Sequence, residues 1–341
     1  MAATIKDIAK KLNISVSTVS YALNNGPRSV PEEVKKRVLQ AAQELQYRPN
    51  RVARNLVTRR SFTLGIVPSE ASNDIVLSPY LQNSLNGIVN TAEAAHYDVL
   101  FFTRYDQKQT REMTDVLLDG RADGLIFLAP PKQAPVLEII ADYGIPHVVI
   151  ASDSGPNSLN FQVDNAAGVQ SALEHLWKLG HRKIGHLHGR LHMADGAVRL
   201  EGYRKFLADR GLPLCEEWVA PGDFTIEGGF AGMRRIFDAA ERPTAVFCAN
   251  DEMAVGAIHA AKAAGIKVPD DLSVVGFDNV PLSANLMPAI TTVRQPVQEM
   301  ASQATHALIR LINGEQVPQP IALPTELIVR ESTSSPKEDT Q

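Results

Sequence analysis

Six polar or aromatic side chains in the larger part of the chain could bind a small molecule. Each lies in or just after a loop that follows an apolar run, where the loops of a parallel sheet converge. The six are Asp153, Arg199, Phe224, Asn250, Asp251 and Asp278. Carboxylates accept hydrogen bonds from vicinal hydroxyl groups, an asparagine amide donates and accepts, and an aromatic face covers a sugar ring or stacks on a planar base. This chemistry is typical of polyol or sugar recognition.

A structural role competes with ligand binding at these positions. Asp251 could instead cap the helix expected over 252–263, and Asp278 could merely start a turn. Arg199 could form a surface ion pair, and Phe224 could simply pack against its neighbours. Asp153 is the weakest candidate, because residues 152–157 form a turn-rich segment.

The chain carries none of the common catalytic motifs. G-x-S-x-G, the P-loop and H-E-x-x-H are all missing. His186 and His188 would share one face of a strand, but no third metal ligand is clearly placed. We therefore expect no metal, no other cofactor and no enzymatic activity. A sugar-modifying enzyme and an exported sugar-binding receptor are the alternatives from other classes, and neither explains the first 58 residues.

Apolar runs alternating with helical stretches would position the candidate side chains. The expected strands are 63–67, 99–102, 124–128, 147–151, 183–187, 244–248 and 272–276. Helical patterns such as 81–95 and 166–179 lie between them. This alternation predicts parallel sheets with helices on both faces, and its length fits two doubly wound lobes.

The first 60 residues differ from the rest by their charge. They hold 12 Lys or Arg and 4 Asp or Glu, a net charge of +8. The remaining residues hold 22 Lys or Arg and 34 Asp or Glu, a net charge of −12. The two net charges add up to the −4 of the whole chain. A basic segment on an acidic body indicates contact with a polyanion, although a solvated basic surface would have the same composition.

Two short helices with a tight turn between them are predicted near the N-terminus. The first has an apolar face at Ile5, Ile8, Ala9 and Leu12. Asn13 tolerates the left-handed conformation that ends a helix, and Ser15 can cap a second helix over 16–23. A third helix is expected over 31–46. Together they predict a helix-turn-helix whose second helix enters the major groove, with a generic three-helix bundle as the alternative.

A short basic segment follows the third predicted helix. Pro49 ends that helix, and Asn50 can cap a new one that is too short to be stable alone in water. The new helix carries two arginines beside an apolar strip that includes Ala53 and Leu56. An apolar side chain inserted between base steps of the minor groove kinks DNA. The segment could therefore form a helix only when it is paired and docked.

These features together resemble the LacI/GalR family of bacterial transcription regulators. The matching residues of the N-terminal part are Thr4–Ala9, Ser15–Ser20, Leu23-Asn24, Tyr47–Asn50, Ala53 and Leu56. Those of the larger part are Arg121–Gly124, Val163–Asn165, Leu179–Ile184, Arg199–Tyr203, Asn250–Gly256, Asp271–Asp278 and Ile290–Val293. The ordered set covers residues 4–332, nearly the whole chain.

The resemblance implies DNA contacts in the N-terminal part. The residues are Thr4, Ile5, Ser15, Val16, Ser17, Thr18, Ser20, Tyr21, Asn24, Asn50, Ala53 and Leu56. Base contacts fall on Val16, Ser17 and Tyr21, and Leu56 is the minor-groove wedge. Tyr21 stands where arginine is commonest in the family, so a changed operator sequence is expected. In the larger part the resemblance makes Arg199 and Asp278 the most constant ligand contacts, with Asn250 beside them in sugar-responsive members.

The resemblance also implies an architecture and a function. The fold is an all-α helix-turn-helix headpiece (1–48), a hinge helix and linker (49–60), a two-lobed α/β periplasmic-binding-protein-like domain of doubly wound parallel sheets (61–332), and a disordered tail (333–341). We expect a homodimer that binds near-palindromic double-stranded operator DNA. Its operator affinity would be switched by a small-molecule effector, a sugar or alternatively a purine or nucleoside co-repressor.

The expected location is the cytoplasm. The first residues have no apolar stretch of a signal peptide, and no apolar run is long enough to cross a bilayer. The two cysteines, Cys215 and Cys248, do not suggest a disulfide framework. We therefore expect no contact with a membrane.

Overall fold

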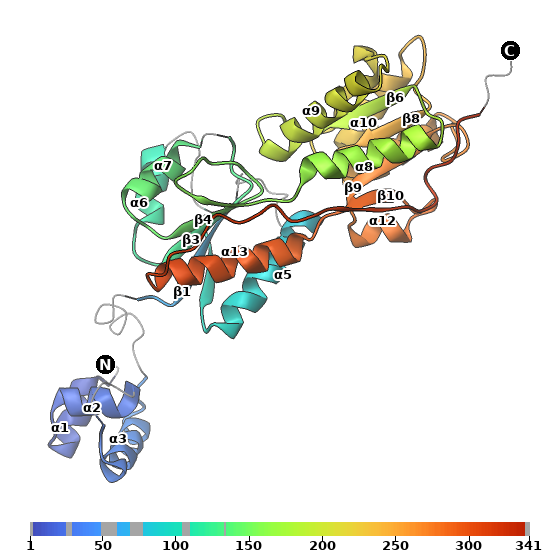
Figure 1. Cartoon of the computed structure of the whole chain (residues 1–341). Coiled ribbons are helices and arrows are strands. Elements are labelled where there is room, and N and C mark those ends of the chain that lie inside the picture. Colours follow the sequence, from blue (N-terminus) through green and yellow to red (C-terminus); the bar gives the residue numbers. More distant parts are fainter. Residues whose placement is uncertain are drawn as a thin grey trace. The chain divides into compact units, whose positions relative to one another are not determined.

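The computed structural model of the chain describes residues 3–24, 29–48, 60–68, 78–103, 110–132 and 134–337. The chain divides into two compact units, Met1–Ser61 and Phe62–Gln341 (Figure 1). We describe each unit by itself. None of the helices within the described residues is long and apolar enough to span a membrane.

The first unit contains three helices, α1 (Ile5–Leu12), α2 (Val16–Asn24) and α3 (Glu32–Glu44). Asn13 ends α1 in the left-handed conformation, with φ 53° and ψ 47°, as its type predicts. The Ser15 hydroxyl accepts a hydrogen bond from the Thr18 amide at 3.0 Å and so caps α2. The core residues shared by the three helices are Ile8, Ala9, Val19, Ala22, Val38, Ala41 and Ala42. The predicted helix-turn-helix is confirmed.

The first lobe of the second unit is built on a five-stranded parallel sheet. Its order is β2-β1-β3-β4-β5, with β1 (Thr63–Pro68), β2 (Asp98–Phe101), β3 (Gly124–Leu128), β4 (His147–Ile150) and β5 (Leu159–Phe161). Helices α5 (Pro79–Ala94) and α13 (Val297–Ile312) pack on one face. Helices α6 (Thr110–Leu117) and α7 (Pro135–Asp142) pack on the other. The lobe is therefore doubly wound.

The second lobe repeats this plan with six strands. The order is β11-β10-β9-β8-β6-β7, with β6 (Ile184–His188), β7 (Val219–Pro221), β8 (Ala245–Cys248), β9 (Ser273–Asp278), β10 (Thr291–Arg294) and β11 (Glu326–Ile328). Helices α8 (Asn165–Lys178) and α9 (Ala194–Asp209) cover one face, and α10 (Ile226–Phe237) and α11 (Asp251–Ala263) the other. The sheet is parallel except for the edge strand β11, which runs antiparallel to β10. The two short elements η2 (Glu216–Trp218) and α12 (Pro281–Asn285) complete the lobe.

The chain crosses between the lobes three times, as the order of its elements requires (Figure 1). It leaves the first lobe after β5, returns between β10 and α13, and crosses again before β11. Val163 of the first crossing and Leu323 of the third form a parallel β-bridge. The two-lobed α/β architecture is confirmed.

The expectation of a disordered C-terminal tail is wrong for residues 333–337, and residues 338–341 lie outside the described part. Residues 331–337 lie against the second lobe at the amino ends of β9 and β10. The Val274 amide donates to the Ser332 carbonyl at 2.8 Å, and the Thr291 amide donates to the Ser332 hydroxyl at 2.8 Å. The His181 ring contacts the Ser334 carbonyl at 2.9 Å. A polar composition suggested disorder, but these hydroxyl groups satisfy backbone groups at the ends of the two strands.

Replacing Ser332 with alanine should lower the free energy of unfolding of the second unit by about 1–3 kcal/mol, because the buried Thr291 amide loses its acceptor. Urea unfolding would measure the change. The exposed Ser335 provides the control, since its replacement by alanine should have little effect. Equal stability of the two variants would contradict a structural role for the segment.

Candidate functional site

The outer face of α2 presents most of the residues expected to contact DNA. Ser15, Val16 and Ser17 are exposed, with Val16 42% exposed, and Tyr21 is half-buried. Thr18 and Ser20 are also half-buried. Val19 and Ala22 of the same helix face the core instead. The helix therefore has a small, polar outer face of the kind that fits a major groove.

The remaining DNA-contact predictions have different surroundings. Thr4 is exposed at the start of α1, where its amide and hydroxyl both donate to the Asp7 carboxylate at 2.8 and 2.7 Å. Ile5 is half-buried against the helical core. Asn24 is the last residue of α2. The predictions for Asn50, Ala53 and Leu56 lie outside the described residues.

Arg199 is the centre of a buried polar cluster in the second lobe. Its side chain, 2% exposed, comes from α9 and lies over the Phe277 ring, with 3.9 Å between the guanidinium carbon and the ring centroid. Nε donates to Asn165 Oδ1 at 2.8 Å, and Nη1 donates to the Ala249 carbonyl at 2.6 Å. The surface ion pair considered for Arg199 is therefore excluded, because the guanidinium is buried.

Asp278 lies beside this arginine at the end of β9. Its Oδ1 is 3.8 Å from Arg199 Nη1 and accepts a hydrogen bond from Gln295 Nε2. Burial raises the pKa of Asp278 to about 8, and the nearby arginine opposes this shift. The backbone at Asp278 has φ 117°, in a region that L-residues rarely adopt. A buried carboxyl group in a strained turn is characteristic of a functional position.

Sequence reasoning missed two further carboxyl groups, Asp195 in the cluster itself and Glu252, which is near enough to Asp278 for the two charges to interact. Asp195 Oδ1 accepts from Asn165 Nδ2 at 3.0 Å, and Asp195 Oδ2 is 3.6 Å from Arg199 Nη2. Glu252 follows in the first turn of α11, where burial and the charge of Asp278 raise its pKa to about 7. Asp195 precedes Arg199 by four residues in one helix, and this i, i+4 spacing is the signal that could have identified it.

Asn250 and Asp251 have structural roles that the structure makes explicit. Asn250, not Asp251, caps α11, because its Oδ1 accepts from the Met253 amide at 2.9 Å. The Asn250 amide nitrogen donates to the Phe224 carbonyl at 3.2 Å. Asp251 is completely buried, and its carboxylate accepts from the Val280 amide at 2.9 Å and from the Thr292 hydroxyl. The capping role considered as an alternative for Asp251 is therefore wrong, and its carboxylate joins α11 to β10 and to the segment that follows β9.

Phe224 and Asp153 lie outside the hydrogen-bonded cluster. Phe224 is half-buried and has a left-handed backbone, with φ 62°. Its ring lies directly over Gly189, where an added Cβ would come within 2.0 Å of a ring carbon, so only glycine fits beneath it. Asp153 is exposed, and its Oδ1 accepts from the Gly155 amide at 3.2 Å in a turn.

The first lobe contributes to the same region through Tyr80, whose hydroxyl group lies within range of the charges of Asp195, Asp278 and Arg199. Its buried oxygen has no hydrogen-bond partner of good geometry among the described residues, and the same holds for Arg199 Nη2 and Gln295 Oε1. Burial raises the pKa of Tyr80, and the negative charges of Asp195 and Asp278 in the second lobe raise it further. Buried polar atoms without partners are costly, so they indicate groups that await a ligand or water.

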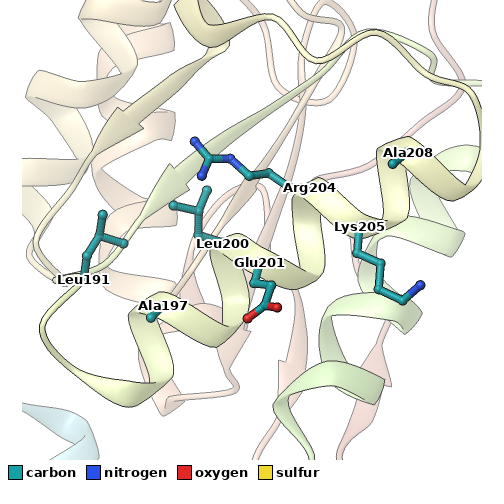
Figure 2. Close-up of a pocket in the computed structure, with 7 residues that line it drawn as sticks. All are labelled: Leu191, Ala197, Leu200, Glu201, Arg204, Lys205 and Ala208. Atoms are coloured by element: carbon teal, nitrogen blue, oxygen red, sulfur yellow. The ribbon is translucent and has the colours of Figure 1, made fainter. Parts of the chain in front are cut away.

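Two of the pockets formed by described residues of the second unit bear on where a ligand could bind. One, of about 710 Å³, is lined by α5, α13, the crossing segment between β10 and α13, and Asp278, so it shares Asp278 and Gln295 with the cluster. It does not include Arg199, Phe224 or Asn250. The other, of about 470 Å³, lies on the outer surface of α9 around Leu200 and Arg204 (Figure 2). None of the predicted ligand contacts lines this second pocket.

The histidines of β6 have internal partners. His186 is buried between the rings of Tyr203 and Phe247, with centroid distances of 4.9 and 5.0 Å, and burial lowers its pKa to about 3. His188 Nδ1 contacts the Gly189 carbonyl at 2.8 Å. No group of three potential metal ligands occurs among the described residues.

The carboxyl groups of the cluster make stability depend on pH. Each is harder to ionise in the folded protein than in the unfolded chain. The folded state therefore binds more protons between the ordinary pKa near 4 and the raised values of about 7 for Glu252 and about 8 for Asp278. Where the folded state binds more protons, the free energy of unfolding falls as the pH rises. These groups should thus destabilise the empty second unit progressively from about pH 4 to pH 8.

Replacing Glu252 with glutamine should remove part of this loss. The variant should be about 1–2 kcal/mol more stable than the parent at pH 8 and equally stable at pH 4. This difference in stability is smaller than the full pKa shift would give, because Glu252 is partly exposed and solvent screens its charge. Thermal unfolding between pH 4 and pH 9 would measure the difference. The same replacement at the exposed Glu217 should leave the pH profile unchanged, and a parallel change in both variants would exclude the assigned cause.

The two units define a class of protein: a helix-turn-helix headpiece joined to a two-lobed α/β receptor domain with a polar site at the carboxyl ends of its strands. Residues 4–50 match the family described as "Bacterial regulatory proteins, lacI family", and residues 173–333 match "Periplasmic binding protein-like domain". The chain belongs to the LacI family of bacterial regulatory proteins. It is a DNA-binding transcriptional regulator and not an enzyme.

Relatives and solved structures share the whole architecture. The HTH-type transcriptional repressor PurR of Escherichia coli O1:K1 is 33% identical over 339 residues, covering 97% of each chain. Catabolite control protein A of Priestia megaterium is 31% identical over 338 residues, covering 98% of this chain and 100% of the relative. A Lac repressor dimer bound to operator and the anti-inducer ONPF superposes with a TM-score of 0.86 at 27% identity, covering 98% and 100%. The structure described as a transcriptional regulator CelR–cellobiose complex superposes with a TM-score of 0.75 at 29% identity, covering 97% of this chain and 99% of the other.

Proposed function

We propose that this regulator is a repressor whose affinity for operator DNA is switched by a small-molecule effector bound between its two lobes. The observation that carries the proposal is the buried cluster around Arg199, to which both lobes contribute polar groups without partners. A ligand that satisfies these groups would favour one arrangement of the lobes over another. Such differential binding is what shifts an allosteric equilibrium.

The effector is proposed to be a sugar. Asp195, Asp278 and Glu252 offer acceptors for vicinal hydroxyl groups, and the half-buried Phe224 ring can cover the apolar side of a sugar ring. The described polar contacts of Asn250 and Asp251 are internal, so we assign these residues to positioning the loops around the site. Asp153, which is exposed, remains only a predicted ligand contact. The solved relative CelR is described as a complex with cellobiose, which supports a carbohydrate in this fold.

The headpiece is proposed to contact the operator through α2. Val16, Ser17 and Tyr21 would contact base edges, while Thr18, Ser20 and Asn24 would contact phosphates together with Thr4. A single headpiece contacts too few base pairs for specificity in a genome, so we propose a homodimer on a near-palindromic operator. The Lac repressor, which superposes on this chain, is described as a dimer bound to operator. We propose that the regulator acts in the cytoplasm.

Replacing Leu56 with alanine tests the proposed hinge. If Leu56 inserts between base steps in the minor groove, the variant should bind operator about 10- to 100-fold more weakly, because unstacking is no longer stabilised by an apolar wedge. Fluorescence anisotropy with an operator selected from a random DNA pool would measure the affinity. Ligand binding to the larger unit should be unchanged, and full operator affinity in the variant would contradict the wedge.

A thermal-shift screen of the full chain tests the effector proposal. A sugar at about 100 times its dissociation constant should stabilise the protein by roughly 2.7 kcal/mol. The stabilising compound should then change the operator affinity. A compound that is chemically converted instead of bound would contradict the assignment as a regulator.

A further inference from the structure

Two histidines of the second lobe lie against the C-terminal segment. Residues 331–337, which we call the C-terminal clasp, lie at the amino ends of β9 and β10. Nε2 of His181, a side chain that is 1% exposed, is 2.9 Å from the Ser334 carbonyl oxygen. Nε2 of the half-buried His175, from α8, is 2.9 Å from the Thr333 hydroxyl. The proposed function uses neither histidine.

The partners of His181 favour its neutral form. The Ser334 carbonyl oxygen can only accept, so Nε2 carries the proton and donates to it. Nδ1 is then the acceptor of the neutral ring, and the Thr244 hydroxyl donates to it at 2.8 Å. The Ser273 hydroxyl is 3.0 Å from Nε2 and 3.1 Å from the same carbonyl oxygen. The ring therefore binds the clasp as a neutral imidazole.

An additional proton on either ring would have no carboxylate beside it among the described contacts. The carboxylates of the surrounding elements are engaged elsewhere: Glu174 with Lys178 and Arg210, Glu241 with Lys183, Asp271 with Lys337, and Glu331 with the Ala289 amide. Asp270 lies within range of the charge of Lys337. Burial lowers the pKa of both histidines, and the charges of His175 and Arg182 lower that of His181 further, while the Ser334 carbonyl opposes the shift.

The clasp supplies hydrogen-bond acceptors to the amino ends of two strands. The Val274 amide donates to the Ser332 carbonyl and the Thr291 amide to the Ser332 hydroxyl, each at 2.8 Å. In return, the Ser334 amide donates to the Ser273 hydroxyl at 3.0 Å. Detachment of the clasp would leave these amides open to water. Exchange of their hydrogens with solvent therefore reports on its release.

We propose that the clasp is released by acid: protonation of His181 and His175 detaches residues 331–337 from the second lobe. A protonated His181 in the closed form is a buried cation beside Arg182, whereas in the open form both rings are hydrated. The open form therefore binds more protons below the ordinary histidine pKa of 6.5. The free energy of opening falls as the pH falls below that value, and above it the clasp stays closed.

The release of the clasp has to be observed locally. The carboxyl groups near Arg199 affect overall stability in the opposite direction, because their raised pKa values lower the free energy of unfolding as the pH rises. A global unfolding curve would therefore mix the two effects. Hydrogen exchange at single backbone amides separates them, since each amide reports on the opening of its own surroundings.

Hydrogen exchange of the full chain, corrected for the intrinsic exchange rate at each pH, tests the proposal. Between about pH 7.5 and about pH 5, the opening constants at Val274, Thr291 and Ser334 should rise together by about tenfold or more, because each histidine can contribute up to about tenfold per pH unit. The amide of Phe247, in the central strand β8, should show no such rise. An equal rise at Phe247, or no rise at the three clasp amides, would overturn the proposal.

Glutamine variants assign the pH dependence to the two histidines. His175→Gln keeps a hydrogen-bonding side chain toward Thr333 but cannot be protonated, so the rise at the clasp amides should be smaller by about threefold or more. His181→Gln should reduce it similarly. His306→Gln, at an exposed position of α13 in the first lobe, is the matched control and should behave as the parent does.

His175→Gln decides the test alone if His181→Gln does not fold, because His175 is only half-buried. An undiminished rise in His175→Gln, with or without His181→Gln, would show that protonation of the histidines does not release the clasp. An equal reduction in the His306→Gln control would contradict the proposal as well.

Discussion

An Arg199→Ala variant should lose about 3–5 kcal/mol of stability in the second unit and should no longer respond to the effector. The guanidinium lies between Asp195 and Asp278 and holds the Asn165 side chain and the Ala249 carbonyl. Its removal leaves two buried carboxyl groups without their cation and a buried carbonyl without its donor. Urea unfolding and effector titration would measure the two losses.

Arg204 provides the control for this variant. It belongs to the same helix, its side chain is 47% exposed, and it pairs with Glu216 at 3.6 Å. An exposed ion pair contributes at most about 1 kcal/mol, so Arg204→Ala should nearly retain stability and effector binding. The pKa of Asp278 is about 8 even beside the arginine, and loss of the arginine raises it further, so the defect of Arg199→Ala should be larger at pH 9 than at pH 6. Retained effector binding in Arg199→Ala would remove the arginine from the proposed site.

A Tyr21→Ala variant should bind its operator with an affinity lower by about 1–3 kcal/mol per half-site, or roughly 2–6 kcal/mol for a dimer on two half-sites. Tyr21 is half-buried on α2, in the row that also presents Val16 and Ser17. Binding to unrelated DNA depends on phosphate contacts, so it should change little. Competition binding with operator and scrambled DNA would measure both affinities.

Tyr143→Ala is the matched control, because Tyr143 is 66% exposed in the first lobe and lies outside the proposed sites. Its operator affinity should equal that of the parent. If Tyr21→Ala lowered specific and non-specific binding by the same factor, Tyr21 would be a general contact and not a determinant of the operator sequence.

The headpiece could be predicted from the sequence because its determinants are local. The apolar spacing of α1, the left-handed Asn13 and the Ser15 cap all act within a few residues. The alternation of strands and helices in the larger unit is likewise visible in short windows. The ends of the strands could therefore be predicted closely enough to select Arg199 and Asp278 as candidate ligand contacts.

The rest of the site depends on contacts between distant residues. Tyr80 reaches the region from α5, far from the second lobe in sequence, and Gln295 reaches Asp278 from a crossing segment. The spacing of apolar residues in the sequence does not show which distant residues come into contact. The same limit applies to Asp251, whose carboxylate accepts hydrogen bonds from the Val280 amide and the Thr292 hydroxyl, both far from it in sequence. The C-terminal segment was misjudged because its polar side chains satisfy backbone groups at strand ends that only the fold brings close to it.

The most direct test of the account is the operator affinity of the full chain with and without a compound that stabilises its larger unit. An operator is first selected from random DNA, and its dissociation constant is measured by fluorescence anisotropy. Saturation with the stabilising compound should change that constant by about 5- to 150-fold, the usual range of allosteric coupling. An unchanged constant at saturation would contradict the claim that the two units form a ligand-switched regulator.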